Sequence, residues 1–479
     1  MTASIKMRAH VTAAVLAAFA LRLYFVWRFP FYDAGDTPIY QQLAHNWLRH
    51  GIYGLEISGQ LTPVDIRAPG YPAFLAAVYM FFGESARAVM VAQALVGVLT
   101  CVLVAAMAAV LAPRESRRRV ALAALWLAAL CPFTANYTAV VLTETLTIFL
   151  SALALLVLME ALRGLRQANG LAQAGAPSRM PWLMGAIVVG FGTLFRPETP
   201  LILAATGTVL VALWWRPKNW PKLLQTGMLL AVGLILPLLP WAARNWRVLH
   251  TAQFLAPRYS ELPGEFTPRG FYAWSGTWLW RFRDVYQVLW NQDGAEIHIA
   301  DIPASAFDSP AERARVAALL ARYNETTDMT PDLDRGFAAI ARERTARHPL
   351  RTYFTVPLLR CFSMWFTPRV EMLPLSGHLW PIHYWWEDSE PQYCISLGLF
   401  LLGLAYAVMA LSGAWRVRSD PAALLLVAYI VIRTAFLTTV ETPEPRYVLE
   451  CFPAVFALAA QLWAKPAAQP VAIAETAAN

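Results

Sequence analysis

Charged residues are scarce in this sequence. Only 15% of its 479 residues are charged and 58% are hydrophobic, whereas a soluble protein carries about a quarter charged residues. This composition excludes an ordinary soluble enzyme. Long apolar runs recur from one end of the chain to the other. We therefore expect an all-α polytopic membrane protein whose apolar faces are solvated by lipid.

Three kinds of motif are also missing. The five cysteines form no C-x-x-C pair, so the sequence carries no zinc or thiol-redox signature. No glycine-rich phosphate loop stands at a strand–helix junction, which argues against a nucleotide-sugar site. The basic residues give a net charge of +8, but they are scattered over short loops. A nucleic-acid partner is therefore not expected.

Ten segments read as membrane-spanning helices. They cover residues 11–29, 88–112, 119–136, 139–161, 181–196, 199–215, 223–241, 393–414, 421–439 and 447–464. Residues 69–82 are equally apolar but short, with two prolines near the start. They predict a surface-lying or re-entrant helix. The stretch 350–367 contains Pro357 and Arg360, which favour a membrane-surface helix, although a span stays open.

The distribution of lysine and arginine predicts the orientation. If 69–82 does not cross, the basic loops after residues 112, 161, 215 and 414 fall on the side of Lys6 and Arg8, as the positive-inside rule requires. The segments 30–87, 242–392 and 440–446 then face outward. The expected organisation is an N-terminal transmembrane module with a catalytic first loop, an outer region with a juxtamembrane helix, C-terminal helices and a cytoplasmic tail. The module covers residues 1–241, with its loop at 30–87, and the outer region covers 242–392. The C-terminal helices cover 393–464 and the tail covers 465–479.

The first outer loop contains two aspartates, Asp33 and Asp36, three residues apart. After Asp36, apolar residues recur at spacings of three and four, and Gly51 supplies a stop. This pattern predicts an amphipathic interfacial helix of about a dozen residues. Asp36 stands at the N-cap position, so it either caps this helix or takes part in chemistry. Asp33 reads as a turn residue or as a supporting carboxylate.

Further charged residues are predicted at the same outer face. Each of them, taken alone, fits a side chain that reaches to the membrane interface, but together they favour an anion site. They are Arg67, Glu144, Arg196, Arg244 and Arg446. Arginines can stabilise a departing phosphate, and a nearby carboxylate can deprotonate an acceptor hydroxyl. A lipid-linked phospho-sugar is the donor that suits this combination.

Six short motifs, in this order, resemble those of the bacterial branch of the GT-C glycosyltransferases. They are G-D-x-x-x-Y at 35–40, R-x-P-G-Y-P at 67–72, T-E at 143–144, R-P at 196–197, P-W-x-x-R-N at 240–245 and E-x-R-Y at 444–447. The set is similar to that of dolichyl-phosphate-mannose protein mannosyltransferases and of lipid A aminoarabinose transferases. Aspartate followed by threonine at 36–37, and Arg67-Ala68-Pro69 where relatives have lysine–proline–proline, disfavour these two activities proper.

The resemblance implies a GT-C-like bundle in the bacterial inner membrane, with its active site facing the periplasm. It also implies inverting transfer from a polyprenyl-monophosphate sugar to a periplasmic lipid, glycan or protein. The implied residues are Asp36 and Glu144 for catalysis, Arg67, Arg196, Arg244 and Arg446 for the donor phosphate, and Asp33, Tyr40, Tyr71, Glu444 and Tyr447 in support.

Two other functions and a metal stay open. Buried charges and ten helices are compatible with a flippase for a lipid-linked glycan, although transporters usually have duplicated halves and midplane charges. An O-antigen ligase or polymerase would also need an arginine-rich outer pocket. No cofactor is predicted with certainty. A divalent ion could aid phosphate departure, with His378 and His383 among the available ligands.

Overall fold

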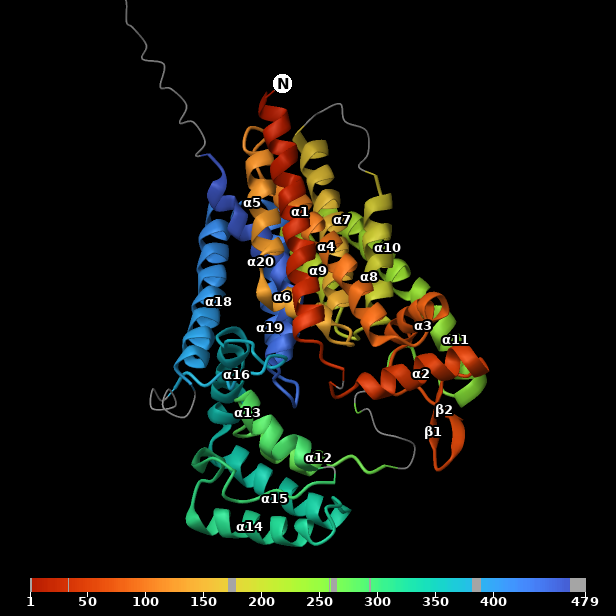
Figure 1. Ribbon diagram of the computed structural model, residues 1–479, viewed down its shortest axis with the longest axis vertical. Helices are drawn as coiled ribbons and strands as arrows, with labels where there is room; N and C mark the ends of the chain where they lie inside the picture. The colour runs from red at the N-terminus through yellow and green to blue at the C-terminus, as the bar shows by residue number, and fades with distance from the viewer. Residues whose placement is uncertain are drawn as a thin grey trace, which may run out of the picture.

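The computed structural model describes residues 2–32, 34–170, 178–257, 259, 265–292, 294–380 and 389–465. A long bundle of helices carries a smaller helical lobe at one end, and the N-terminus lies at the opposite end (Figure 1). A single two-stranded sheet accompanies the helices in the described ranges. The predicted all-α membrane fold is therefore confirmed.

All ten predicted spans fall on helical segments of the bundle. The helices are α1 (Thr2–Arg28), α4 (Ala86–Leu111), α5 (Arg117–Ala129), α6 (Pro132–Asn136), α7 (Glu144–Gly170), α8 (Met180–Thr193), α9 (Leu201–Trp214), α10 (Trp220–Ile235), α11 (Leu239–Leu249), α18 (Glu390–Arg416), α19 (Pro421–Leu437) and α20 (Phe452–Ala459). In the described chain, five helical stretches are by themselves long and apolar enough to cross a membrane. A sixth is α5 with the helical turns after Pro132, bent by 53°, because proline supplies no amide hydrogen to continue a helix.

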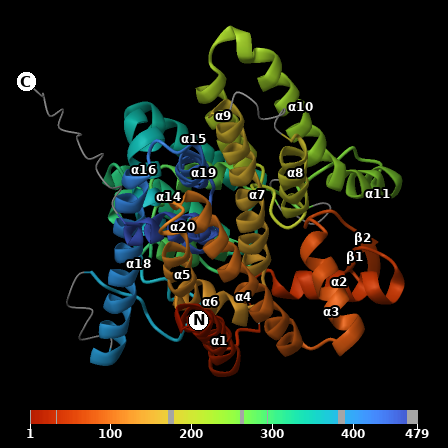
Figure 2. The ribbon, with the colours of Figure 1, turned by 90° about the horizontal axis from the view of Figure 1, so that it is seen from above.

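The first loop forms a platform beside the end of the bundle. It contains α2 (Thr37–His50), the hairpin of β1 (Gly54–Ile57) and β2 (Gln60–Pro63), and α3 (Gly70–Phe82), all of which lie outside the helix bundle when it is seen from above (Figure 2). The predicted amphipathic helix is confirmed as α2, which buries Tyr40 and Leu43. It ends where Gly51 adopts φ of 68° and its amide donates to the Trp47 carbonyl, as a left-handed cap requires.

Helix α3 comes close to the turn after α8. The Gly70 amide donates to the Leu194 carbonyl at 2.8 Å, and a Cβ on Gly70 would meet that oxygen at 2.6 Å. Only glycine permits this approach. With 13 residues, α3 is shorter than the ~20 residues that a span needs. The predicted surface-lying or re-entrant helix agrees with this length.

The lobe is built from the second outer region. Its elements are α12 (Arg269–Gly276), α13 (Phe282–Asp284), the helical turns η4 (Val285–Leu289), η5 (Trp290–Gln292) and η6 (Ala304–Ala306), then α14 (Pro310–Asn324) and α15 (Pro331–Arg347). Trp274, Trp278 and Phe337 are fully or almost fully buried in its core. The segment η7 (Arg351–Thr355) and α16 (Val356–Trp365) then return the chain to the bundle (Figure 1). The segments η7 and α16 follow each other without a break and together have fifteen residues, fewer than the ~20 that a typical span needs. The assignment of this stretch as a membrane-surface helix stays a prediction.

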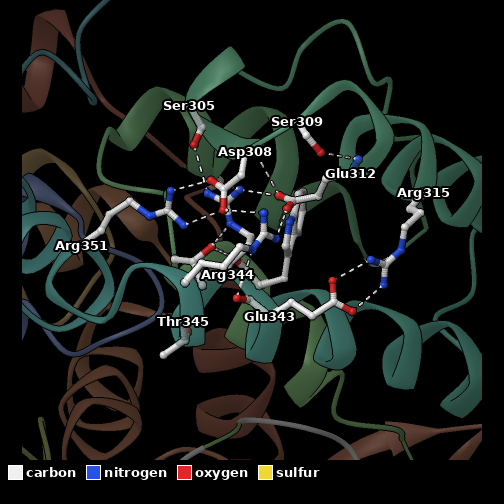
Figure 3. Close-up of polar contacts among 12 residues, drawn as sticks. Ser305, Asp308, Ser309, Glu312, Arg315, Glu343, Arg344, Thr345 and Arg351 are labelled. Carbon is white, nitrogen blue, oxygen red and sulfur yellow. Dashed lines mark hydrogen bonds and ion pairs between the residues drawn. The ribbon is translucent and has the colours of Figure 1, made fainter.

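A buried ionic network joins η7 to the lobe (Figure 3). The Arg344 side chain is 0% exposed and lies 3.0 Å from an Asp308 oxygen, and it also pairs with Glu312. Arg351 of η7 binds Asp308 at 2.6 Å. Burial raises the pKa of Asp308, but the hydrogen bond from Arg351 and the charge of Arg344 lower it more. The net pKa falls below the ordinary carboxyl value, so the network stays charged at neutral pH.

We expect Arg344→Met to loosen the lobe. The change leaves Asp308 and Glu312 short of one guanidinium in a buried site, and breaking a buried ion pair costs about 3–5 kcal/mol. Limited proteolysis of the purified protein should then cut within residues 265–350 at least tenfold faster. Arg335→Met is the matched control, because Arg335 is 75% exposed and pairs only with Asp332 among the ion pairs found. Equal cleavage rates for the two variants would contradict this account.

Candidate active site

A cavity of about 680 Å³ lies between the end of the bundle and the lobe. Both N-terminal loop residues and lobe residues form its wall. The lining residues are Phe31, Ala34, Gly35, Asp36, Arg67, Tyr137, Tyr259, Glu265, Tyr272, Phe282, Tyr286, Leu289, Trp290, Gln292, Glu371, Met372, Glu441, Thr442, Glu444, Pro445, Arg446 and Tyr447. Segments more than 400 positions apart therefore meet at one site, which we call the polar cavity.

Asp36 occupies the N-cap position of α2 but does not cap it. Its backbone is helical, with φ of −75° and ψ of −7°, and its side chain accepts no backbone hydrogen bond from the helix. Instead, Oδ1 accepts from Nη2 of Arg67 at 2.6 Å. The Asp36 side chain remains 37% exposed. Asp36 therefore does not cap the helix, and its carboxylate faces a guanidinium and the polar cavity.

The charge state of Asp36 is set by competing effects. Burial raises the pKa of the carboxyl, but the Arg67 guanidinium lowers it through its charge and its hydrogen bond, and Arg446 and Arg196 lower it further from a longer distance. The net pKa is below the ordinary aspartate value. Asp36 is therefore an anion at any physiological pH.

Arg67 is held rigidly between the hairpin and α3. Its own backbone carbonyl accepts a 2.9 Å hydrogen bond from the Tyr53 hydroxyl, and its Nη1 donates to the Ile66 carbonyl at 3.0 Å. Pro69 follows directly as the N-cap of α3. The guanidinium thus reaches the polar cavity from a fixed backbone, which suits a bidentate anion ligand.

Behind the cavity, arginines and glutamates form a second ionic cluster. Arg446 lines the cavity and contacts Glu444 at 2.6 Å and Glu144 at 3.4 Å. Arg196 does not line the cavity, because it contacts Glu144 at 3.1 Å, Glu198 at 3.3 Å and Glu450 at 3.6 Å. Glu144 is itself only 2% exposed. Among the predicted phosphate ligands, Arg67 and Arg446 therefore share the cavity with Asp36, while Arg196 supports it from behind.

Arg244 lies on the other side of the platform. Its guanidinium donates to the carbonyls of Val64 and Tyr53 and to the Asn245 side chain, so it fastens α11 to the hairpin. It borders a different cavity of about 700 Å³, which we call the apolar cavity. The lining is Trp47, Gly51, Ile52, Tyr53, Pro63, Pro69, Gly70, Ala73, Phe74, Phe191, Leu194, Phe195, Pro237, Pro240, Trp241, Arg244 and Val248. The two cavities flank the segment from Arg67 to Gly70.

The predicted supporting residues have different positions. Tyr447 lines the polar cavity and its hydroxyl donates to Glu444. Tyr40 and Tyr71 are buried and pack edge to face, with ring centroids 5.1 Å apart. Tyr71 also donates to the Gln93 side chain at 2.8 Å. These two tyrosines position α2 against α3 and do not reach the polar cavity. The prediction for Asp33 falls outside the described residues.

Sequence reasoning missed Glu371. This residue lines the polar cavity from the segment after α16, and no local motif marks it. Glu198 and Glu450 were also missed, although each follows a quoted motif, R-P at 196–197 and E-x-R-Y at 444–447, within three residues. Among the described residues no group of three or more histidine, cysteine, aspartate or glutamate side chains is arranged to hold a metal ion. His383, one of the two suggested ligands, is not among those residues.

Comparison with known proteins agrees with the motifs. Residues 66–241 match the family model described as dolichyl-phosphate-mannose-protein mannosyltransferase, which confirms the resemblance to GT-C glycosyltransferases over that part of the chain. No curated protein sequence matches.

Solved structures that match this chain include the Archaeoglobus fulgidus oligosaccharyltransferase in complex with zinc and sulfate. It is 14% identical, with a TM-score of 0.49 over 95% of this chain and 48% of that one. ArnT from Cupriavidus metallidurans in the apo state is 13% identical, with a TM-score of 0.42 over 97% and 77%. ArnT bound to undecaprenyl phosphate is 14% identical, with a TM-score of 0.39 over 93% and 77%. The chain thus spans about half the length of the archaeal enzyme.

Proposed function

We propose that the protein is an inverting glycosyltransferase that moves a sugar from a polyprenyl-monophosphate donor to a hydroxyl-bearing acceptor of the cell envelope. The observation that carries this proposal is the Asp36–Arg67 pair in the polar cavity. It combines an ionised carboxylate with a guanidinium on a fixed backbone. The proposed general base, Asp36, is therefore hydrogen-bonded directly to the proposed phosphate ligand, Arg67.

In the proposed reaction, the acceptor oxygen attacks the anomeric carbon and the bond from that carbon to the phosphate oxygen breaks. The acceptor proton moves to Asp36. Arg67 and Arg446 stabilise the negative charge that grows on the departing phosphate. Glu144 acts indirectly, since its ion pairs with Arg446 and Arg196 fix where these cations stand.

The apolar cavity suits the donor's hydrocarbon chain. Its lining contains aromatic, aliphatic and proline side chains with Arg244 as the one charged residue. It shares the segment at Arg67–Gly70 with the polar cavity, so a chain lying there can end in a phosphate near Arg67. Arg244 then supports the cavity wall, and its assignment as a phosphate ligand stays a prediction.

A comparison of envelope glycans tests the reaction class. Cells that lack the gene should lose one sugar substituent from an envelope component, and the corresponding polyprenyl-phosphate sugar should accumulate. Mass spectrometry of both fractions identifies the donor and the acceptor, and plasmid-borne wild-type gene should restore them. Loss of the sugar with the accumulated lipid-linked donor confined to the cytoplasmic leaflet would instead indicate a flippase, and an unchanged glycan profile would contradict both functions.

Arg67→Gln should change the pH dependence of the reaction. Because Arg67 lowers the pKa of Asp36 and burial raises it, removal of the guanidinium leaves the raising effect in place. The acid limb of kcat/KM should therefore move to higher pH, and the plateau should fall about a hundredfold with the loss of one charge-stabilising group. Arg49→Gln is the control, since Arg49 is exposed and pairs with Glu84. Identical acid limbs in the wild type and Arg67→Gln would argue against Asp36 as the base.

A further inference from the structure

We propose that Arg433, which lies inside the membrane bundle, is a positioning residue for the phosphate ligand Arg446 and for its neighbour Tyr447. Both of these residues belong to the short helical segment η8 (Pro445–Cys451), which Arg433 holds in place from within the bundle. The inference rests on the proposed function, because that function makes Arg446 a ligand of the departing phosphate. It adds a residue that acts on the reaction only through another residue.

Arg433 is the one charged residue of the apolar helix α19. Its side chain is 0% exposed, and its Nη2 lies 2.7 Å from a Glu450 oxygen and 3.5 Å from a Glu198 oxygen. A charge inside an apolar membrane helix is costly, and such residues are generally functional. The closer of its two ion-pair partners, Glu450, belongs to η8.

The Arg433 guanidinium makes two contacts with η8. Nη2 donates to the Glu450 side chain at 2.7 Å, and Nε donates to the backbone carbonyl of Tyr447 at 3.2 Å. The two acceptors are three residues apart, which is one turn of the 3-10 geometry that η8 adopts. A guanidinium presents its donors as a rigid planar fork, so it fixes both the position and the direction of this turn. Because 3-10 hydrogen bonds have poorer geometry than those of an α-helix, η8 depends on such outside contacts.

The segment η8 joins the interior of the bundle to the polar cavity. Pro445, Arg446 and Tyr447 at its start line the cavity, whereas residues 448–451 are all buried. A displacement of the buried half therefore moves the cavity half with it. Misplacing a reacting or charge-stabilising group by about 1 Å can cost about a hundredfold in rate.

Arg433 also ends a row of side chains whose charges alternate. Arg446 contacts Glu144, Glu144 contacts Arg196, Arg196 contacts Glu450, and Glu450 contacts Arg433, at distances of 3.4, 3.1, 3.6 and 2.7 Å. Each carboxylate in this row is shared by two guanidiniums, so its position depends on both. Arg433 thus restrains Arg446 by two routes, the backbone of η8 and the ionic row.

Hydrogen exchange of the purified full-length protein tests the anchoring of η8 directly. Arg433→Lys keeps a cation beside Glu450, but an ammonium does not reproduce the planar fork. Amide exchange in residues 446–451 should therefore become about tenfold faster, as local opening becomes easier. The double variant Arg433→Met with Glu450→Gln removes both charges of the closest pair together, which avoids leaving either one buried without the other. It should speed exchange in the same residues.

Arg22→Met is the matched control. Arg22 is also an arginine of a membrane helix and is only 2% exposed. Its guanidinium donates to the Ala18 carbonyl and to the Cys101 sulfur, and none of its hydrogen bonds found in the described chain reaches η8. Exchange in residues 446–451 should therefore stay at the wild-type rate in this variant.

Transfer kinetics separate positioning from a purely structural role. Arg433→Lys should lower kcat/KM for the lipid-linked donor about tenfold when Arg446 is present. In an Arg446→Gln background the same change should have no further effect, because the residue through which Arg433 acts is gone. Arg22→Met should change kcat/KM by one and the same factor in both backgrounds, as independent sites do.

Two results would overturn the positioning role of Arg433. One is unchanged exchange in residues 446–451 for both Arg433 variants, and the other is an equal loss of kcat/KM with and without Arg446. A third result concerns the reaction itself. Faster exchange in both variants, with no transfer by the wild-type protein from any polyprenyl-phosphate sugar, would refute the proposed function and leave the anchoring of η8 standing.

Discussion

Replacing Asp36 by asparagine is expected to abolish sugar transfer without unfolding the protein. The amide cannot take the acceptor proton, and a general base contributes about a hundredfold to ten-thousandfold to rate. The effect should fall on kcat, because Arg67 remains to bind the donor phosphate. Stability should change little, because the asparagine Oδ1 can still accept the hydrogen bond from Arg67, and the Asp36 side chain makes no helix-capping bond and is 37% exposed. Transfer is measured with purified protein and the donor identified from envelope glycans.

Glu56→Gln is the matched control for this experiment. Glu56 is an exposed carboxylate on β1 of the same loop, and it does not line the polar cavity. It should keep wild-type turnover. A fully active Asp36→Asn variant would refute the base assignment, and a variant with unchanged kcat but weaker donor binding would reassign Asp36 to orienting Arg67.

Replacing Arg196 by methionine is expected to destabilise the protein strongly. The guanidinium lies within 3.6 Å of carboxylates from Glu144, Glu198 and Glu450, and Glu144 and Glu450 are both 2% exposed. Its removal leaves these three anions with Arg433 and Arg446 as their remaining ion-pair partners among the described residues. Breaking a buried ion pair in this way costs about 3–5 kcal/mol. Thermal unfolding in detergent should shift down by several degrees and activity should fall with it.

This experiment also separates two roles for Arg196. The sequence predicts a donor-phosphate ligand, whereas the contacts favour a residue that positions Glu144 and, through it, Arg446. Arg216→Met serves as control, because Arg216 is exposed and makes none of the ion pairs found in the described residues. Normal stability together with a raised KM for the donor would support the phosphate role.

Features that depend on neighbouring residues were predictable. The apolar runs predicted the helices of the bundle, because a membrane-spanning element needs a continuous apolar length whatever its tertiary contacts. The period of three and four predicted α2, and Gly51 predicted its end, because capping is a local property of the backbone. The motifs also predicted that Asp36, Arg67 and Arg446 belong to one site, and these three residues do line the same cavity.

Other features required long-range contacts. The sequence left Asp36 between capping a helix and chemistry. The tertiary structure excludes capping, because the side chain makes no cap hydrogen bond and instead contacts Arg67, 31 positions away, at 2.6 Å. Arg67, Arg196 and Arg244 are all arginines that the sequence predicts at the outer face. In the structure, however, carboxylates surround Arg196 and backbone carbonyls surround Arg244. A guanidinium has the same chemistry at each of these positions, so its role depends on which acceptors folding brings to it.

The amino-acid order by itself therefore determined an all-α membrane bundle and its interfacial helix. It also determined that arginines and carboxylates gather at the outer end of the bundle. The tertiary structure decided which charges face each other and which face a cavity. It also brought Trp290 of the lobe and Glu371 of the segment after α16 into the wall of the cavity that Asp36 of the first loop lines. The physical reason is range: apolar length and helical period act over one or two turns, whereas ion pairs and cavity walls join atoms hundreds of residues apart in the chain.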